Sequence, residues 1–173
     1  PTSAFEQKFF NEIEKFAFYK ALDEKCVQNT GKDIPALKAA GEYKEIVANL
    51  LEAKGLNYGQ LPKGLLLFHT YGEGARTAME EHLAAGAMYA KNNAGEVNIH
   101  FTVSPEHQAL FEQLVAEKAG GYEDQFSVKY DVSFSIQKPS TDTVAAAMDN
   151  TPFRDKNNKL LYRPGGHGAL IEN

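Results

Sequence analysis

The sequence has little cysteine and no long hydrophobic run. Its single cysteine, Cys26, excludes an internal disulfide bond and fits a reducing compartment. Because Cys26 lies within a helical pattern, we expect its thiol to be packed rather than reactive. No apolar run approaches the roughly 18 residues of a membrane-spanning helix, and no signal peptide is visible. These absences predict a cytoplasmic protein without a membrane partner.

Positive charge is also scarce. The chain has 18 Lys and Arg against 23 Asp and Glu, a net charge of -5 and a pI near 5.6. No basic face is implied, which argues against nucleic acid as the main partner. One or two local cations can still hold a small anionic ligand. The five histidines show no metal-ligand spacing, so we predict no dedicated zinc site.

The chain is long enough for one domain with its own core, at 173 residues, 43% of them hydrophobic and 24% charged. It begins at Pro1 without a methionine and stops at Asn173, within what reads as the start of a helix. We therefore expect a fragment of a longer protein. An exposed sheet edge in such a fragment could drive homodimerisation.

Residues 1–58 are predicted to form a helical leader or insertion. A helix over residues 3–29 should stop at Gly31, Asp33 should cap a short helix, and a third helix should close at Gly55. No ionisable cluster in this part suggests chemistry. The apolar stripe that we expect to be core comprises Phe5, Phe9, Ile13, Phe16 and Leu22.

Residues 59–173 are predicted to form the core that contains the sheet. Strands alternate here with helices, which predicts right-handed crossovers between parallel strands. We therefore expect an α/β fold, Rossmann-like, with a largely parallel sheet and flanking helices, preceded by the helical N-terminal segment. The predicted strands cover residues 65–68 (an apolar run typical of a strand buried on both faces), 97–103, 128–136 and a short run from 159, and the helices cover 77–89 and 104–118.

Three loops that follow predicted strands carry the candidate binding residues. In a parallel sheet these loops share one edge and could line one cleft. Lysine, arginine and hydroxyl groups beside glycine-rich backbone suit phosphate or sugar recognition. A simple turn and helix cap explains Ser140–Thr143 equally well. The candidates are Arg76, Gln137, Lys138, Ser140, Thr141, Asp142, Thr143, Arg163 and His167, with the glycines Gly165, Gly166 and Gly168.

The glycine cluster around His167 has two interpretations. Glycine costs chain entropy, so three glycines around one histidine indicate close approaches that a side chain would block. A tight turn with a solvent-facing histidine accounts for the same pattern. Magnesium on a ligand phosphate is the expected cofactor, helped by Asp142 or Asp149, because such sites often use only one or two protein carboxylates.

Five segments carry a family resemblance that covers the whole chain. They are PKGLLLFH (62–69), GARTAMEEHL (74–83), IHFTVSPEH (99–107), SIQKPSTDT (135–143) and RPGGHGALIEN (163–173). The chain resembles an uncharacterised bacterial family, domain of unknown function 4301. More distantly, the order of the Pro-Lys pair, the strand end at Gln137 and the Gly-His-Gly loop is similar to UDP-sugar pyrophosphorylases.

The second resemblance implies a mechanism. Those enzymes have a Rossmann-like nucleotidyltransferase fold and join a sugar 1-phosphate to a nucleoside triphosphate with magnesium. The likeness implies that Lys63 steadies phosphates, that Gln137 lies on the uridine side, and that Gly166 to Gly168 contact nucleotide and sugar. Lys63 and Arg76 are the candidate catalytic residues. Without the resemblance, the position of Lys63 before a strand indicates a solvated lysine at the strand end.

The chain also differs from the pyrophosphorylases, and the difference limits the mechanism that the resemblance implies. Their glycine-rich activating loop has no counterpart in the chain, so we expect the isolated fragment to be inactive even if its full-length parent is an enzyme. Two alternatives stay open. One is a non-catalytic module that binds a nucleotide or phosphosugar. The other is a structural or interaction domain that uses the aromatic helical leader as its interface.

Overall fold

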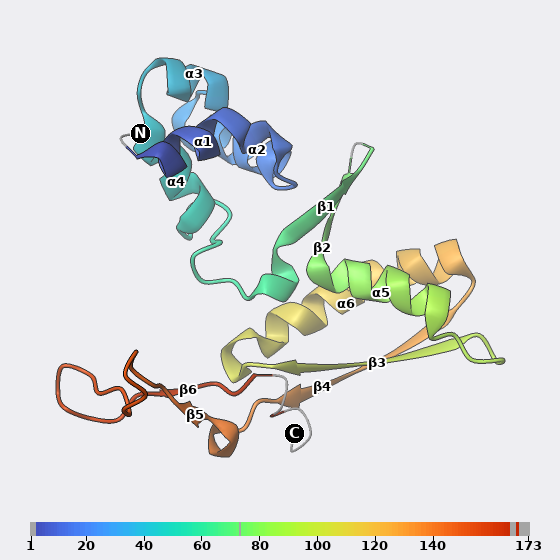
Figure 1. Cartoon of the computed structure of the whole chain (residues 1–173). Coiled ribbons are helices and arrows are strands. Elements are labelled where there is room, and N and C mark those ends of the chain that lie inside the picture. Colours follow the sequence, from blue (N-terminus) through green and yellow to red (C-terminus); the bar gives the residue numbers. More distant parts are fainter. Residues whose placement is uncertain (1–2, 73, 167–168, 170–173) are drawn as a thin grey trace. The chain divides into compact units, whose positions relative to one another are not determined.

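The computed structural model describes residues 3–72, 74–166 and 169, and it divides the chain into two compact units, Pro1–Ala85 and Gly86–Asn173. The predicted boundary at residue 58 lies inside the first unit. Figure 1 shows the elements. In chain order they are α1 (Ala4–Glu12), η1 (Ile13–Lys15), α2 (Tyr19–Thr30), α3 (Ile34–Ala39), α4 (Tyr43–Leu51), η2 (Lys63–Leu65), β1 (Leu67–Tyr71), β2 (Gly74–Thr77), α5 (Ala78–Tyr89), β3 (Glu96–Val103), η3 (Pro105–His107), α6 (Gln108–Phe126), β4 (Lys129–Ile136), η4 (Pro139–Thr141), β5 (Thr143–Val144) and β6 (Tyr162–Arg163).

The first four helices of unit 1 surround a shared apolar core. Gly31 ends α2 in the left-handed conformation, at φ 75°, and the Asp33 side chain accepts a hydrogen bond from the Ala36 N–H at the start of α3. Both caps were predicted, and both are confirmed. Cys26 is buried in this core, as expected. The buried residues are Phe10, Ile13, Leu22, Cys26, Ile34, Leu37, Ile46 and Leu50.

The predicted single helix over residues 3–29 is wrong in its middle. The chain leaves α1 through η1 and becomes extended at Phe16, at φ -82° and ψ 141°. The Phe16 ring then stacks on Phe18, with ring centroids 5.0 Å apart, and Phe18 packs edge-on against Tyr58. Aromatic packing at this corner therefore overrides the helical spacing of the sequence.

Strands β1 and β2 form an antiparallel hairpin that leads into α5. Gly72, at φ 57°, lies in the turn between the strands. Thr77 and Glu80 form a capping box at the start of α5: the Thr77 N–H and hydroxyl donate to the Glu80 carboxylate, and the Glu80 N–H donates to the Thr77 hydroxyl. Both residues are buried. The capping box therefore fixes the point at which β2 ends and α5 begins.

Unit 2 is built on the parallel pair β3 and β4. Eight residue pairs are in register, from Glu96 beside Lys129 to Val103 beside Ile136. One face of this pair is apolar, and Val97 on it packs with Ala87 and Val128. The opposite face is polar along both strands, because side chains alternate between the faces of a sheet.

The expected Rossmann-like, largely parallel sheet is wrong. The described residues form three two-stranded sheets, of which only β3–β4 is parallel. The apolar run that was assigned to a strand buried on both faces ends in β1, whose residues Phe68 to Tyr71 are exposed. A short apolar run indicates a strand without indicating its neighbour. Here the turn at Gly72 lets β1 pair with the residues that follow it.

Candidate functional site

The loop after β4 carries most of the predicted binding residues. The Gln137 N–H donates to the Val103 carbonyl over 3.0 Å, so the ladder of the sheet reaches into the loop. The Thr141 hydroxyl and N–H both donate to the Lys138 carbonyl, at 2.7 and 2.9 Å, and form a tight 3-10 turn. This turn leaves Lys138 and Ser140 exposed at the end of the strand.

The segment from Arg163 to Gly165 packs against this loop. Thr143 in β5 pairs with Arg163 in β6, and the Gln137 side-chain amide donates to the Gly165 carbonyl over 3.0 Å. A Cβ atom on Gly165 would lie 2.6 Å from the Thr141 carbonyl oxygen, which is closer than real contacts allow. The close approach expected of the glycine cluster therefore occurs at Gly165, and the two loops of unit 2 meet there.

The remaining glycines of the cluster differ from Gly165. Among the described residues, and apart from its chain neighbours, no heavy atom lies within 4 Å of a Cβ built on Gly166. His167 and Gly168 lie outside the described residues. The roles assigned to them by resemblance stay predictions.

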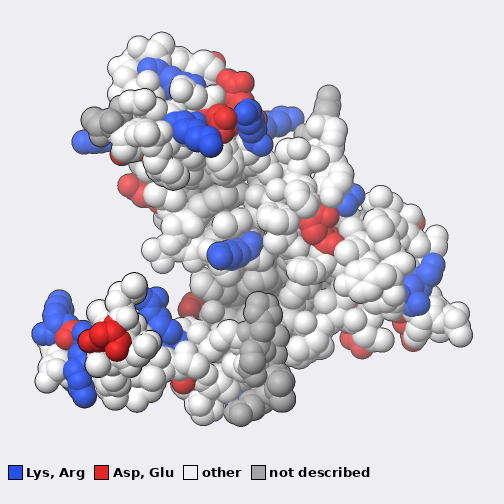
Figure 2. All heavy atoms as spheres, viewed as in Figure 1, with Lys and Arg blue, Asp and Glu red and all other residues white. Residues whose placement is uncertain are grey.

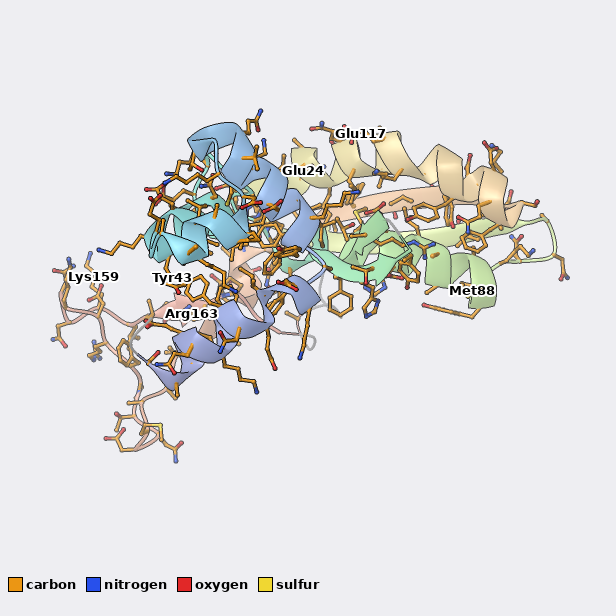
Figure 3. The ribbon with its side chains drawn as sticks, turned by 90° about the horizontal axis from the view of Figure 1, so that it is seen from above. Glu24, Tyr43, Met88, Glu117, Lys159 and Arg163 are labelled. Carbon is orange, nitrogen blue, oxygen red and sulfur yellow. The ribbon has the colours of Figure 1, made fainter. Side chains whose placement is uncertain are left out.

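Residues 143–163, which we name the C-terminal arm, form a positively charged segment in an acidic chain. Four Lys and Arg against two Asp give the arm a net charge of +2, whereas the chain carries -5. Figure 2 shows these basic side chains gathered over the arm, and Figure 3 shows Lys159 and Arg163 on it. The cations are Arg154, Lys156, Lys159 and Arg163.

Both arm aspartates are engaged in local turns. Asp149 accepts hydrogen bonds from the Thr151 hydroxyl and N–H at 2.7 and 3.0 Å, and these bonds lower the pKa of its carboxyl below the ordinary value. Asp155 accepts from the N–H groups of Asn157 and Lys159. Asp142 is the residue that ends η4, in the loop after β4.

The two candidate catalytic residues lie in unit 1, whereas the other candidates lie in unit 2. Lys63 is exposed at the start of η2. The Arg76 guanidinium lies over the Tyr71 ring, 4.1 Å from its centroid, and 3.8 Å from the Glu81 carboxylate. Glu81 also accepts from the Tyr71 hydroxyl at 3.1 Å, which raises the pKa of that phenol. Arg76 thus takes part in a local ion-pair cluster that the sequence did not reveal.

Sequence reasoning also missed a side-chain network on the polar face of β3–β4. His100 lies within hydrogen-bond distance of Ser133 and Ser135. The signal was available: every second residue of both strands is polar from Glu96 to Thr102 and from Lys129 to Ser135. Within the described part of the chain, no three His, Cys, Asp or Glu side chains are grouped to hold a metal ion.

A comparison with models of protein families shows which family the chain belongs to. The model of one family, Domain of unknown function (DUF4301), matches residues 1–173. The chain belongs to the DUF4301 family. No curated protein and no solved structure matches this DUF4301 chain. The first of the two predicted resemblances is therefore confirmed, and the second, to UDP-sugar pyrophosphorylases, receives no support. None of the helices in the described ranges is long and apolar enough to cross a membrane.

Proposed function

We propose that the DUF4301 chain carries part of a binding site for a phosphorylated small molecule, a nucleotide or a sugar phosphate. The site lies where the loop after β4 meets β6 and Gly165. The observation that carries the proposal is the closure of these two segments by the Gln137–Gly165 hydrogen bond, with Arg163 at the junction. Proteins bind phosphate through cationic side chains and hydroxyl groups that lie beside closely packed backbone segments.

The charge distribution supports an anionic ligand. The arm is positive although the chain is acidic, and both of its carboxylates are held by turns. Arg163 is exposed, and no described residue accepts a hydrogen bond from its guanidinium. An arginine of this kind can form a bidentate pair with a phosphate. Asp142 would supply a carboxylate to a magnesium ion that is held mainly by the ligand phosphates.

Isothermal titration calorimetry with UTP, UDP-glucose and glucose 1-phosphate in the presence of magnesium tests the proposal, with uridine as the ligand that lacks phosphate. We expect saturable binding of a phosphorylated ligand and none of uridine. Arg163→Gln should weaken the affinity about 10-fold or more, because a charge-assisted bond contributes about 1.5–3 kcal/mol. Lys156→Gln, which removes the same charge elsewhere on the arm, should leave the affinity unchanged. Equal losses in both variants, or no saturable binding, would reject the site.

As a second candidate function we propose nucleotidyl transfer, with Lys63 and Arg76 acting on phosphate charge. The order of the Pro62-Lys63 pair, Gln137 and the Gly-His-Gly loop supports this proposal, and such transfer requires mainly positioning and charge stabilisation. The test is pyrophosphate release from a nucleoside triphosphate and a sugar 1-phosphate by the protein, with and without Lys63→Ala. Binding without pyrophosphate release would favour the non-catalytic module.

A further inference from the structure

The polar face of the β3–β4 pair holds a continuous chain of four side chains. His100 Nδ1 lies 2.8 Å from the Ser133 hydroxyl, and His100 Nε2 lies 2.9 Å from the Ser135 hydroxyl. Ser135 lies a further 3.0 Å from the Thr102 hydroxyl. The parallel register places His100 opposite Ser133 and Thr102 opposite Ser135, so two adjacent strands hold the whole chain.

The number of protons on the imidazole restricts the direction of these hydrogen bonds. A neutral imidazole has one N–H and one acceptor nitrogen, so one of the two serines donates to the ring while the other accepts from it. One consistent arrangement has Thr102 donating to Ser135, Ser135 donating to Nε2, and Nδ1–H donating to Ser133. In this arrangement Nδ1–H is directed to Ser133, and Nε2 accepts the proton of the Ser135 hydroxyl, which Thr102 also contacts.

We infer that Ser135 is a nucleophile toward carboxylic esters and that His100 is its general base. A serine within hydrogen-bond reach of a histidine that a third group orients is the arrangement that serine nucleophiles require. Ser135 is half-buried between its two partners, whereas Ser133 is exposed, which favours Ser135 as the reacting group. The network contains no residue of the proposed phosphate site.

The reaction proceeds in two balanced steps. The Ser135 hydroxyl gives its proton to His100 Nε2 while an oxygen electron pair forms a bond to the ester carbonyl carbon. Collapse of the tetrahedral intermediate breaks the bond to the alkoxide, which takes the proton from His100 and leaves as the alcohol. Water then attacks the acyl-Ser135 ester and gives one proton to His100. As the acyl bond to Ser135 breaks, His100 returns that proton to the Ser135 oxygen, and the carboxylic acid leaves. The Thr102 hydroxyl lies 3.0 Å from the Ser135 oxygen, and it would have to turn its hydrogen away from Ser135 to donate to the developing oxyanion.

The experiment is incubation of the purified protein with p-nitrophenyl acetate. Release of p-nitrophenolate is followed, and the acetylated residue is located by mass spectrometry of peptides. We expect acetyl on Ser135, and a fall in rate of about 100-fold in Ser135→Ala and in His100→Gln, the scale of a lost general base. Ser133→Ala should react more slowly but still acetylate Ser135. Asn98→Ala, on the same face, should react like the parent chain.

Several results would overturn the inference. Acetyl on Ser133, an unchanged rate in Ser135→Ala, or release no faster than in buffer would each exclude Ser135 as the nucleophile. Thermal melting followed by circular dichroism shows whether each variant folds. If Ser135→Ala does not fold, Ser135→Cys replaces it, since a thiol of similar size should still be acetylated at position 135. Absence of that adduct in a folded Ser135→Cys variant counts against the inference.

Discussion

The side-chain amide of Gln137 donates a hydrogen bond to the carbonyl oxygen of Gly165 over 3.0 Å. This bond joins the end of β4 to a segment 28 residues further along the chain, across the whole C-terminal arm. The two segments approach so closely that position 165 has no room for a Cβ atom. The arm is therefore tied at its base by one side chain and one glycine.

Gly165→Ala should loosen the base of the arm. Its Cβ would lie 2.6 Å from the Thr141 carbonyl oxygen, and relief of such overpacking costs about 1–3 kcal/mol of local stability. Hydrogen exchange measured by mass spectrometry should show faster exchange in residues 141–165. Gly166→Ala is the matched control, because no described residue other than its chain neighbours has a heavy atom within 4 Å of its Cβ position. Equal exchange in the two variants would show that the arm is not tied at Gly165.

Thr77→Ala should destabilise unit 1 more than Ser3→Ala does. Both residues belong to capping boxes, Thr77 with Glu80 and Ser3 with Glu6, but the first box is buried and the second is exposed. Loss of a cap costs about 0.5–2 kcal/mol, and we expect the upper end for Thr77 because its loss removes hydrogen bonds from a buried carboxylate. Urea unfolding of both variants measures the difference. A larger loss in Ser3→Ala would contradict the expectation.

The stability of the chain should fall in alkaline solution in a way that depends on Cys26. Burial raises the pKa of the Cys26 thiol from 9.0 to about 11, because the folded core disfavours the thiolate. The contribution of the neutral thiol is therefore fully present below pH 9 and is lost as the pH rises toward 11. The unfolding free energy should decline less over this interval in Cys26→Ala. The tyrosines titrate in both proteins, so the comparison of slopes isolates Cys26. Parallel slopes would contradict burial of the thiol.

Gly120→Ala should stabilise α6. Gly120 lies in the interior of that helix and is exposed, and outside the adjoining turns of α6 no described residue has a heavy atom within 4 Å of its Cβ position. Alanine should therefore add about 0.5–1 kcal/mol through the lower entropy of the unfolded chain. Gly86→Ala in α5 is the comparison, since its Cβ would meet Ile99 Cδ1 at 3.0 Å and Val97 Cγ1 at 3.1 Å and should be destabilising. Melting temperatures that rank the two variants in the opposite order would contradict this view of the core.

Local features of the fold were predictable because their causes are local. The caps at Gly31 and Asp33 depend on the conformation of one residue and on a hydrogen bond across three, and both were expected. The alternation of residues 128–136 likewise identified β4. Only part of the candidate site could be predicted from the sequence. The sequence predicted the loop after β4 and the segment at Gly165 as candidate binding segments. It did not predict the network at His100, because that network depends on the register between two strands.

The sequence by itself determined the caps at Gly31 and Asp33, the turn that follows β1 and the alternating strand over residues 128–136. These properties follow from side-chain volume, charge and backbone preference within a few residues. Only the tertiary structure decided that β1 pairs with β2 instead of joining a parallel sheet, and that Phe16 interrupts a helical pattern. It also brought Ser133 and Ser135 to the two nitrogens of His100. Strand pairing and aromatic packing are choices among distant partners of similar local preference, so their energy depends on contacts that no short segment contains.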